Sequence, residues 1–229
     1  MKILVVAPHP DDEVLGVGGT ITRLASEGND VTVTIVTKGW EPLFSDSFVE
    51  QGRTEAREAN KMMGVKSLRF MDLPVTKLNQ IPTHELNEKF DRLMVEEEPE
   101  MVFLPFGGDR HEDHRQVFQA CMVALRPASN RKHVRRILCY ETVSETHWSA
   151  AYVESCFEPQ LWIDISEQLP IKLQAMQTYR SQLQKEPDAR SIEALASLAK
   201  WRGSIAGMSA AECFVVIREC WTVPPGSRR

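Results

Sequence analysis

Apolar and polar positions alternate along the first 140 residues in blocks that predict strands and helices in turn. Short apolar runs rich in β-branched residues predict buried strands at residues 3–7, 31–37, 68–71, 101–104 and 136–140. Apolar residues at helical spacing predict the intervening helices at residues 20–26, 50–63, 84–97 and 113–125. This alternation indicates an α/β protein with a mainly parallel sheet and helices on both of its faces.

The last part of the chain has a less regular pattern. A short extended run is expected at 161–165, helices at 166–183 and 191–205, and a final strand at 214–217. No internal repeat, low-complexity tract or linker interrupts the sequence, so residues 1–229 are expected to form a single domain. Residues 224–229 are expected to be a frayed tail, because they begin with two prolines and a glycine.

Composition narrows the class of protein. The chain has 229 residues, 27 Lys and Arg against 32 Asp and Glu, and a formal net charge of −5. A sequence pI near 5.7 argues against a nucleic-acid-binding surface. No apolar run reaches the roughly 18 residues of a membrane span, and the first apolar run is too short for a signal peptide. We therefore expect a cytoplasmic protein, whose five scattered cysteines are reduced thiols.

Two clusters of polar residues directly follow predicted strands. The first is Pro8-His9-Pro10-Asp11-Asp12-Glu13, after the first strand, and the second is Asp109-Arg110-His111-Glu112-Asp113-His114, after the fourth. Ligands bind open parallel sheets at the carboxyl ends of the strands. Both clusters are therefore placed where a binding site is expected.

The residue types in the two clusters suit a divalent metal ion. Imidazole nitrogens and carboxylate oxygens are ordinary zinc ligands, and an open catalytic site has three protein ligands and a water. His9 and Asp12 can supply two ligands, and either His111 or His114 can supply the third. Of the remaining carboxylates, Asp11 and Asp113, one could act as a base while the other orients a histidine.

Each of these residues also has a simpler structural explanation. Asp11 could cap the segment after it, and Asp113 could be the N-cap of its helix. Asp109, Glu112 and Arg115 could form a solvated charged face. The coincidence of two clusters, both after strands, favours a metal site over these separate explanations.

Other catalytic classes fit the sequence less well. The glycines at 16, 18 and 19 follow a strand, as in a dinucleotide-binding fingerprint, but Ile21 stands where the third glycine should be. These glycines are better explained by close packing and a tight turn. No Gly-x-Ser-x-Gly elbow occurs, and Cys121 and Cys139 lie in predicted core elements, so a serine or cysteine nucleophile is not indicated.

The first cluster resembles the Ala-His-Pro-Asp-Asp-Glu signature of the PIG-L/LmbE-like N-acetylglucosaminyl deacetylases, with Pro8 inserted after Ala7. The second resembles that family's His-Pro-Asp-His motif, with Glu112 in place of proline. The similarity continues to the end of the chain, through residues 162–166, 179–182, 202–203, 207 and 211–214.

This resemblance implies a Rossmann-like fold and a zinc ion held by His9, Asp12 and His114. It also implies Asp11 as general base, His111 as acid or oxyanion stabiliser, and Asp113 as the residue that positions His111. Other divalent transition metals could substitute in the same ligand set. A homo-oligomer, either a trimer or a hexamer, is expected from the resemblance alone.

The expected activity is zinc-dependent removal of acetyl from an N-acetylated amino sugar or its conjugate. Candidate substrate contacts are Arg53, implied by the resemblance, together with Trp40 and Glu141, which lie in predicted loops. Arg53 departs from the family pattern, because it lies two residues rather than three before Glu55. The alternatives are a metal enzyme of the hydratase or lyase type, or a sugar- or nucleotide-binding module without catalysis.

Overall fold

The computed structural model describes residues 1–127, 134–150 and 152–221, and the predicted tail at 224–229 lies outside them. The strands are β1 (Lys2–Ala7), β2 (Asp30–Lys38), β3 (Ser67–Pro74), β4 (Met101–Pro105), β5 (Arg136–Tyr140), β6 (Leu161–Asp164) and β7 (Ala211–Glu219). The helices are α1 (Asp12–Ser26), α2 (Asp46–Met62), α3 (Thr83–Glu97), α4 (Glu112–Ala124), α5 (Leu169–Thr178) and α6 (Ile192–Ile205), with short 3₁₀ turns η1 (Leu78–Gln80) and η3 (Thr146–Trp148).

All the described strands belong to one sheet, in the order β3-β2-β1-β4-β5-β7-β6. The first five of these are parallel, and β7 runs antiparallel to both β5 and β6. The chain leaves β1 in one direction toward β2 and later returns to the other side of β1 with β4, so β1 and β4 are neighbours. Such a reversal of strand order opens a crevice at the carboxyl ends of the two strands. Both polar clusters of the sequence follow these two strands.

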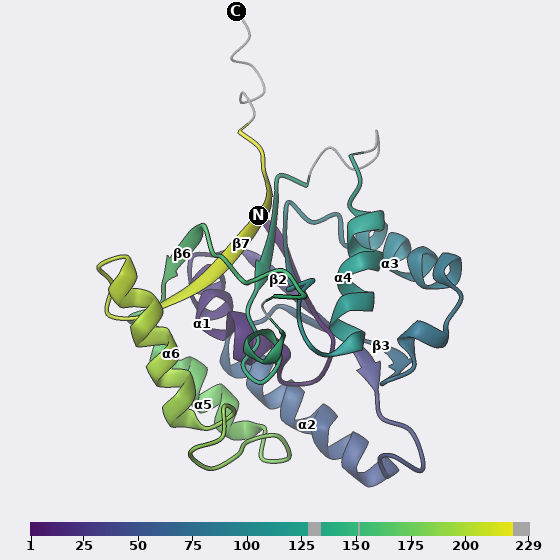
Figure 1. Ribbon diagram of the computed structural model, residues 1–229, viewed down its shortest axis with the longest axis horizontal. Helices are drawn as coiled ribbons and strands as arrows, with labels where there is room; N and C mark the ends of the chain where they lie inside the picture. Colours follow the sequence, from purple (N-terminus) through teal and green to yellow (C-terminus); the bar gives the residue numbers. More distant parts are fainter. Residues whose placement is uncertain (128–133, 151, 222–229) are drawn as a thin grey trace, which may run out of the picture.

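Helices cover both faces of the sheet, as Figure 1 shows, with α1, α2, α5 and α6 on one face and α3 and α4 on the other. The alternation of side chains along β1 accounts for the two layers: Ile3, Val5 and Ala7 pack into the first core, whereas Leu4 and Val6 pack into the second. The predicted α/β fold with a mainly parallel sheet is therefore confirmed. No helix in the described part of the chain is both long and apolar enough to cross a membrane.

Helix α1 begins at Asp12, eight residues before the predicted start, so the glycines at 16, 18 and 19 lie inside a helix and not in a turn. Close packing explains them. A Cβ atom on Gly16 would lie 2.2 Å from the Tyr140 ring, and one on Gly19 would lie 2.7 Å from Ile165. The predicted close packing is therefore confirmed. The predicted turn is wrong, because these glycines continue helix α1.

A buried ion pair also fixes α1. The carboxylate of Glu212 on β7 accepts hydrogen bonds from the backbone N–H groups of Gly19 and Thr20, at 2.9 and 2.7 Å. The Lys172 ammonium on α5 donates to the same carboxylate at 2.6 Å and to the carbonyl oxygen of Leu15 at 2.8 Å. Helix α1 is thus held to α5 and β7 by charged hydrogen bonds as well as by apolar packing.

The C-terminal helices differ slightly from the prediction. Helix α5 covers Leu169–Thr178 and not the whole of 166–183, because the chain turns at Tyr179, whose side chain is fully buried. Helix α6 begins one residue after its predicted start, where the Ser191 hydroxyl accepts from the N–H of Ala194 and caps the helix. The segment between these helices then returns to the edge of the site, where Gln182 and Arg190 lie.

We expect Gly16→Ala to destabilise the protein by about 1–3 kcal/mol, because the added methyl overlaps the buried Tyr140 ring and the core must shift. Gly52→Ala is the matched control: Gly52 is also helical, but a Cβ there meets nothing within 4 Å. That control should be neutral or stabilise by up to about 1 kcal/mol. Urea unfolding of both variants measures the difference, and equal stabilities would contradict the packing argument.

Candidate metal centre and active site

The turn between β1 and α1 places the first polar cluster at the carboxyl end of β1. Asp11 has φ 113°, a conformation that non-glycine residues adopt rarely and under strain. Its backbone N–H donates to the fully buried Glu13 carboxylate at 3.2 Å. That carboxylate also accepts from Asn60 at 2.9 Å and from the Tyr179 hydroxyl at 2.5 Å. The strained turn is therefore anchored by contacts from α2 and from the segment after α5.

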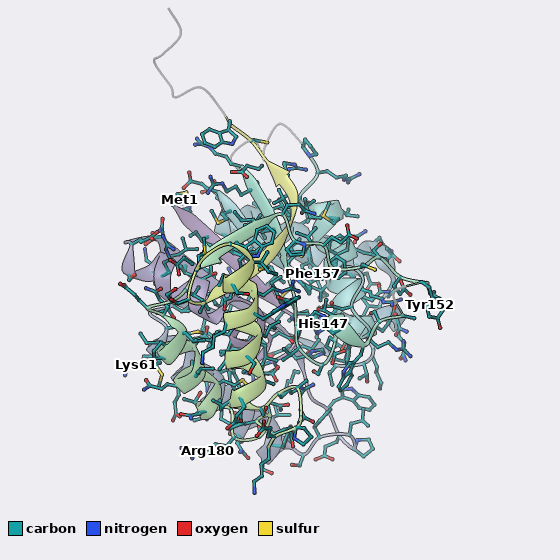
Figure 2. The ribbon with its side chains drawn as sticks, turned by 60° about the vertical axis from the view of Figure 1, so that its left-hand side comes forward. Met1, Lys61, His147, Tyr152, Phe157 and Arg180 are labelled. Carbon is teal, nitrogen blue, oxygen red and sulfur yellow. The ribbon has the colours of Figure 1, made fainter. Side chains whose placement is uncertain are left out.

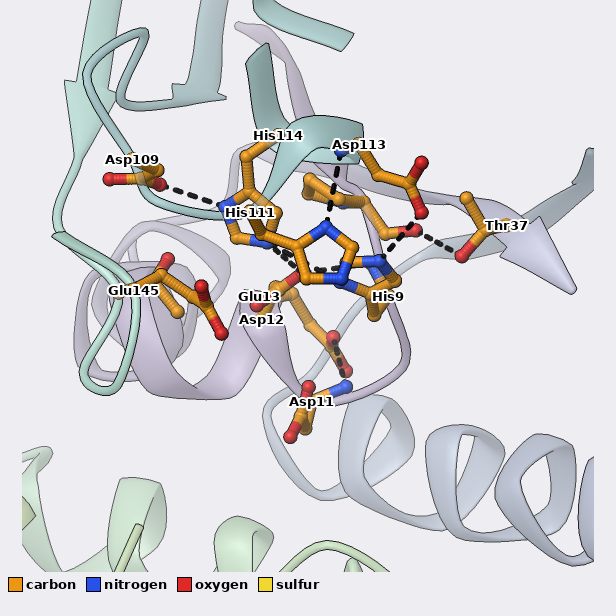
Figure 3. A network of polar contacts seen from close by, with 12 residues as sticks. His9, Asp11, Asp12, Glu13, Thr37, Asp109, His111, Asp113, His114 and Glu145 are labelled. Carbon is orange, nitrogen blue, oxygen red and sulfur yellow. Dashed lines mark hydrogen bonds and ion pairs between the residues drawn. The ribbon is translucent and has the colours of Figure 1, made fainter. Parts of the chain in front are cut away.

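Three donor atoms from the two clusters form a compact triangle (Figure 3). His9 Nδ1 lies 3.1 Å from Asp12 Oδ2 and 3.3 Å from His114 Nε2, and the last two atoms are 3.2 Å apart. Tetrahedral zinc, with bonds of about 2.0–2.1 Å, separates its ligand atoms by roughly 3.3 Å. The chemistry and the spacing of these three donors therefore fit a divalent metal such as zinc.

Two further carboxylates bind the outer nitrogens of the two histidines. His9 Nε2 donates to Asp113 Oδ2 at 3.2 Å, and His114 Nδ1 donates to Asp109 Oδ2 at 2.8 Å. Asp109 is itself held by the Thr146 hydroxyl at 2.6 Å, and Asp113 accepts from the Thr76 N–H at 2.7 Å. Such carboxylates fix the ring orientation and tautomer of metal-binding histidines.

The charges of these carboxylates dominate the acid–base properties of the site. Burial alone would lower the pKa of His9, but hydrogen bonds to Asp113 and Asp12 raise it to about 9. Burial alone would also lower the pKa of His114, but the charges of Asp12 and Asp109 and their hydrogen bonds raise it to about 10. Burial would raise the pKa of Asp12, but the charge of His114 holds it well below its usual range. A metal ion must therefore displace protons from the two histidines.

His111 differs from the other two histidines. Burial, together with the nearby charges of His9 and His114, lowers its pKa to about 4, so the ring is neutral at pH 7. Its Nδ1 accepts from the backbone N–H of Asp113 at 3.1 Å, which makes His111 the N-cap of α4. In a neutral ring that accepts at Nδ1, the proton is on Nε2. His111 therefore presents an N–H donor, and it lines the cavity next to the triangle.

Asp11 lies beside the triangle with one oxygen unused. Its side chain is buried and makes no capping hydrogen bond to α1, which removes the simpler role considered for it. Oδ2 has no hydrogen-bond partner among the described residues, and the Arg190 guanidinium lies 3.7 Å from it. A buried carboxylate oxygen without a partner, next to three metal-type donors, is available to accept a proton.

Several predicted roles need correction. The Asp113 carboxylate hydrogen-bonds to His9 and not to His111, and the helix is capped by His111 and not by Asp113. Asp109 is fully buried and does not belong to a solvated face. These contacts join residues about 100 positions apart or depend on the exact start of α4, so spacing along the chain does not reveal them.

The three predicted substrate contacts lie in different surroundings. Arg53 lines the cavity, but its guanidinium is paired with Asp72. Trp40 is outside the described cavity lining, where its Nε1–H donates to the carbonyl of Val75 at 2.9 Å. Glu141 is also outside that lining. Its carboxylate accepts from the Arg202 guanidinium of α6 at 2.6 Å.

Glu141 and Arg202 form a buried ion pair at the centre of a small network of side chains. His147 lies 3.0 Å from the Glu141 carboxylate, and the Arg202 guanidinium lies 5.7 Å from the Phe157 ring centroid. Figure 2 shows His147 and Phe157 beside α6. Glu141 therefore joins β5 to α6 and has no oxygen free for a ligand in this arrangement.

Sequence reasoning did not assign several residues of the site, among them Glu13, Asp109, Glu145, Thr146 and Arg190. Glu13 and Asp109 were visible as members of the two clusters. Glu145 and Arg190 are single charged residues in loops, and nothing in their local sequence distinguishes them from solvated side chains.

Comparisons with known proteins agree with this geometry. The chain is 27% identical over 226 residues to a diacetylchitobiose deacetylase from Thermococcus kodakarensis, with 92% of this chain and 81% of the relative covered. A probable N-acetyl-alpha-D-glucosaminyl L-malate deacetylase 2 from Bacillus cereus is 27% identical over 190 residues, with coverage of 79% and 83%. Among solved structures, the conserved protein TT1542 from Thermus thermophilus matches with a TM-score of 0.79 and 28% identity, and the match covers 100% of both chains.

The family model of the GlcNAc-PI de-N-acetylases matches residues 4–125, which run from within β1 to the end of α4 and include both polar clusters. This match covers more than half of the 229 residues. The protein therefore belongs to the PIG-L family of de-N-acetylases.

Proposed function

We propose that this protein is a zinc-dependent N-deacetylase that releases acetate and a free amine from an N-acetylated amino sugar or its conjugate. The observation that carries the proposal is the triangle of His9, Asp12 and His114, with donor atoms 3.1–3.3 Å apart and the unpartnered Asp11 oxygen beside it. The named relatives support the substrate class, because two of them are described as deacetylases of N-acetylglucosamine compounds.

The metal, when bound, lowers the pKa of a coordinated water toward about 7 and polarises the acetyl carbonyl. Asp11 then accepts the proton of the attacking water through its free Oδ2, and its buried position excludes competing solvent. The same carboxyl can return that proton to the amide nitrogen as the C–N bond breaks, so that acetate and the free amine are released. His111 donates its Nε2–H to the carbonyl oxygen, where negative charge develops in the transition state.

Asp113 and Asp109 keep His9 and His114 in the required tautomers. The proposed roles therefore fall into three groups: His9, Asp12 and His114 as metal ligands, Asp11 and His111 as catalytic residues, and Asp109 and Asp113 as positioning residues. The Asp113 carboxylate is thus proposed to act through His9, while its backbone N–H holds Nδ1 of His111.

We expect Asp11→Asn and Asp12→Asn to fail in different ways. Asparagine adopts positive φ readily, so Asp11→Asn should keep the turn and the metal, while the loss of the base slows turnover by about 10²–10⁴-fold, or roughly 3–5 kcal/mol of barrier. Asp12→Asn replaces an anionic ligand with a neutral amide, so the protein should lose metal on dialysis. Zinc content, melting temperature and turnover of both variants test this. Full activity in zinc-loaded Asp11→Asn would exclude the base assignment.

Zinc affinity should rise with pH. Protons on His9 and His114, with pKa values raised to about 9 and about 10, compete with the metal. Below the pKa of a histidine, each proton that the metal must displace makes the apparent zinc affinity about tenfold higher for every pH unit gained. Competition with a chelating indicator at pH 7 and pH 8 should show at least about a tenfold increase. Histidines of ordinary pKa near 6.5 would give almost no change over this interval, so a flat profile contradicts the proposed proton competition.

The homo-oligomer is proposed from the family resemblance, and the cytoplasmic location from the short first apolar run and the lack of a membrane-length apolar run in the sequence. The assembly can be tested directly. Light scattering at micromolar concentration should give the mass of a trimer or hexamer of the 26.0 kDa chain. A monomeric mass would contradict the expectation.

A further inference from the structure

The cavity beside the metal-ligand triangle has two chemically different walls. It has a volume of about 260 Å³, and His9, Asp11, Asp12 and His111 lie at its inner end. In Figure 3, Thr37, at the end of β2, lies on one side of the histidines, and Glu145 lies on the other. Residues on the Thr37 side come from positions 37–76, and those on the Glu145 side come from positions 145–190.

The wall on the Thr37 side is formed mainly by five apolar side chains, which we call the apolar wall: Phe44, Phe48, Val49, Phe70 and Val75. The Phe44 and Phe48 rings are stacked, with centroids 5.5 Å apart and an angle of 22° between planes. Gly39 lets the loop pack closely there, because a Cβ would lie 2.9 Å from Phe44 Cβ and 3.0 Å from Val49. The apolar surface is therefore built by packing and is not a chance exposure of single side chains.

Arg53 does not make this wall cationic. Its guanidinium is paired with Asp72 and lies 4.7 Å from the centroid of the Phe70 ring. The charge is thus paired within the protein, and the guanidinium lies over the Phe70 ring. Lys38 is the other cation on this side of the cavity lining. An anionic ligand group could contact it, and the experiment below includes that possibility.

The opposite wall is polar and is formed by Glu145, Gln182 and Arg190. The Arg190 guanidinium donates to Ser144 Oγ at 3.0 Å and to Gln182 Oε1 at 3.3 Å. It lies 3.8 Å from the Glu145 carboxylate, beyond hydrogen-bond distance. These groups keep hydrogen-bonding capacity and suit the hydroxyls of a sugar ring.

We propose that the substrate carries a neutral apolar aglycone larger than a methyl group, such as an aryl group, which packs against the apolar wall. The amino sugar lies against the polar wall, with its acetamide at the metal ligands. A monosaccharide alone would leave five apolar side chains in contact with water, whereas an aglycone would bury them. This inference rests on the proposed deacetylation and adds the class of group that the sugar is attached to.

The test compares the methyl, phenyl and 4-carboxyphenyl glycosides of N-acetylglucosamine, each as both anomers, with the zinc-loaded protein. We expect kcat/KM for a phenyl glycoside to exceed that of the matching methyl glycoside by about tenfold or more, because a buried apolar group changes transition-state binding by that order. The 4-carboxyphenyl glycoside has nearly the same shape with an added charge. It should be hydrolysed less efficiently than the phenyl glycoside, because burying a carboxylate on the apolar wall is costly.

Val49→Thr keeps the shape of the side chain and replaces a methyl with a hydroxyl. It should reduce the phenyl-to-methyl ratio of kcat/KM by about threefold to tenfold. Val95→Thr is the matched control, because Val95 lies on α3 outside the cavity lining and is 54% exposed. The control should leave every ratio unchanged.

Equal kcat/KM for the phenyl and methyl glycosides would overturn the inference. A preference for the 4-carboxyphenyl glycoside would also overturn it, because it would point to recognition of an anion by Lys38. An equal loss of kcat/KM for the phenyl and methyl glycosides in Val49→Thr would overturn it as well. Dissociation constants from calorimetry separate this inference from the proposed function. If no glycoside releases acetate, deacetylation of these sugars fails. Tighter binding of the phenyl glycoside, weakened by Val49→Thr, would still support the apolar wall, and equal dissociation constants would refute it.

Discussion

Five carboxylates are buried around the turn after β1 and the start of α4, and the site depends on how their negative charge is balanced: Asp11, Asp12, Glu13, Asp109 and Asp113. A buried carboxylate is costly unless it is neutralised or hydrogen-bonded. His9 pairs with Asp12 and Asp113, and His114 pairs with Asp109. These two histidines therefore balance three of the five carboxylates. Burial raises the pKa of Glu13 to about 7, and the group is held by two side-chain donors.

Asp11 is the carboxylate left without such compensation. Burial, and then the charge of Asp12, raise the pKa of Asp11 well above the usual range. The Arg190 guanidinium, 3.7 Å from the Asp11 carboxylate, lowers this pKa but does not cancel the rise. A divalent cation held by the neighbouring ligands would oppose it more strongly, because it adds two positive charges to the same small volume. Metal binding and the ionisation of the proposed base are therefore linked by electrostatics.

Much of the fold follows from local sequence patterns. The apolar runs predict the parallel strands because both faces of each are covered, and the two polar clusters mark the carboxyl ends of β1 and β4. Long-range contacts decide the rest. Tyr140 and Ile165, which pack against the glycines of α1, are more than 120 residues away in the sequence, so local patterns do not reveal this packing. The pairing of Asp113 with His9 depends on the adjacency of β1 and β4, which no local pattern contains.

The separation of the cavity into walls from different chain segments has a consequence for evolution. The metal ligands lie in two short turns, whereas the apolar wall comes from residues 44–75 and the polar wall from residues 145–190. Substitutions in the apolar wall can change which molecules fit without touching a ligand, its supporting carboxylate or Asp11, whereas Arg190 in the polar wall also faces Asp11. Selectivity can therefore diverge between descendants of one ancestral gene while the hydrolytic chemistry is inherited intact, so that one scaffold can serve unrelated metabolic needs.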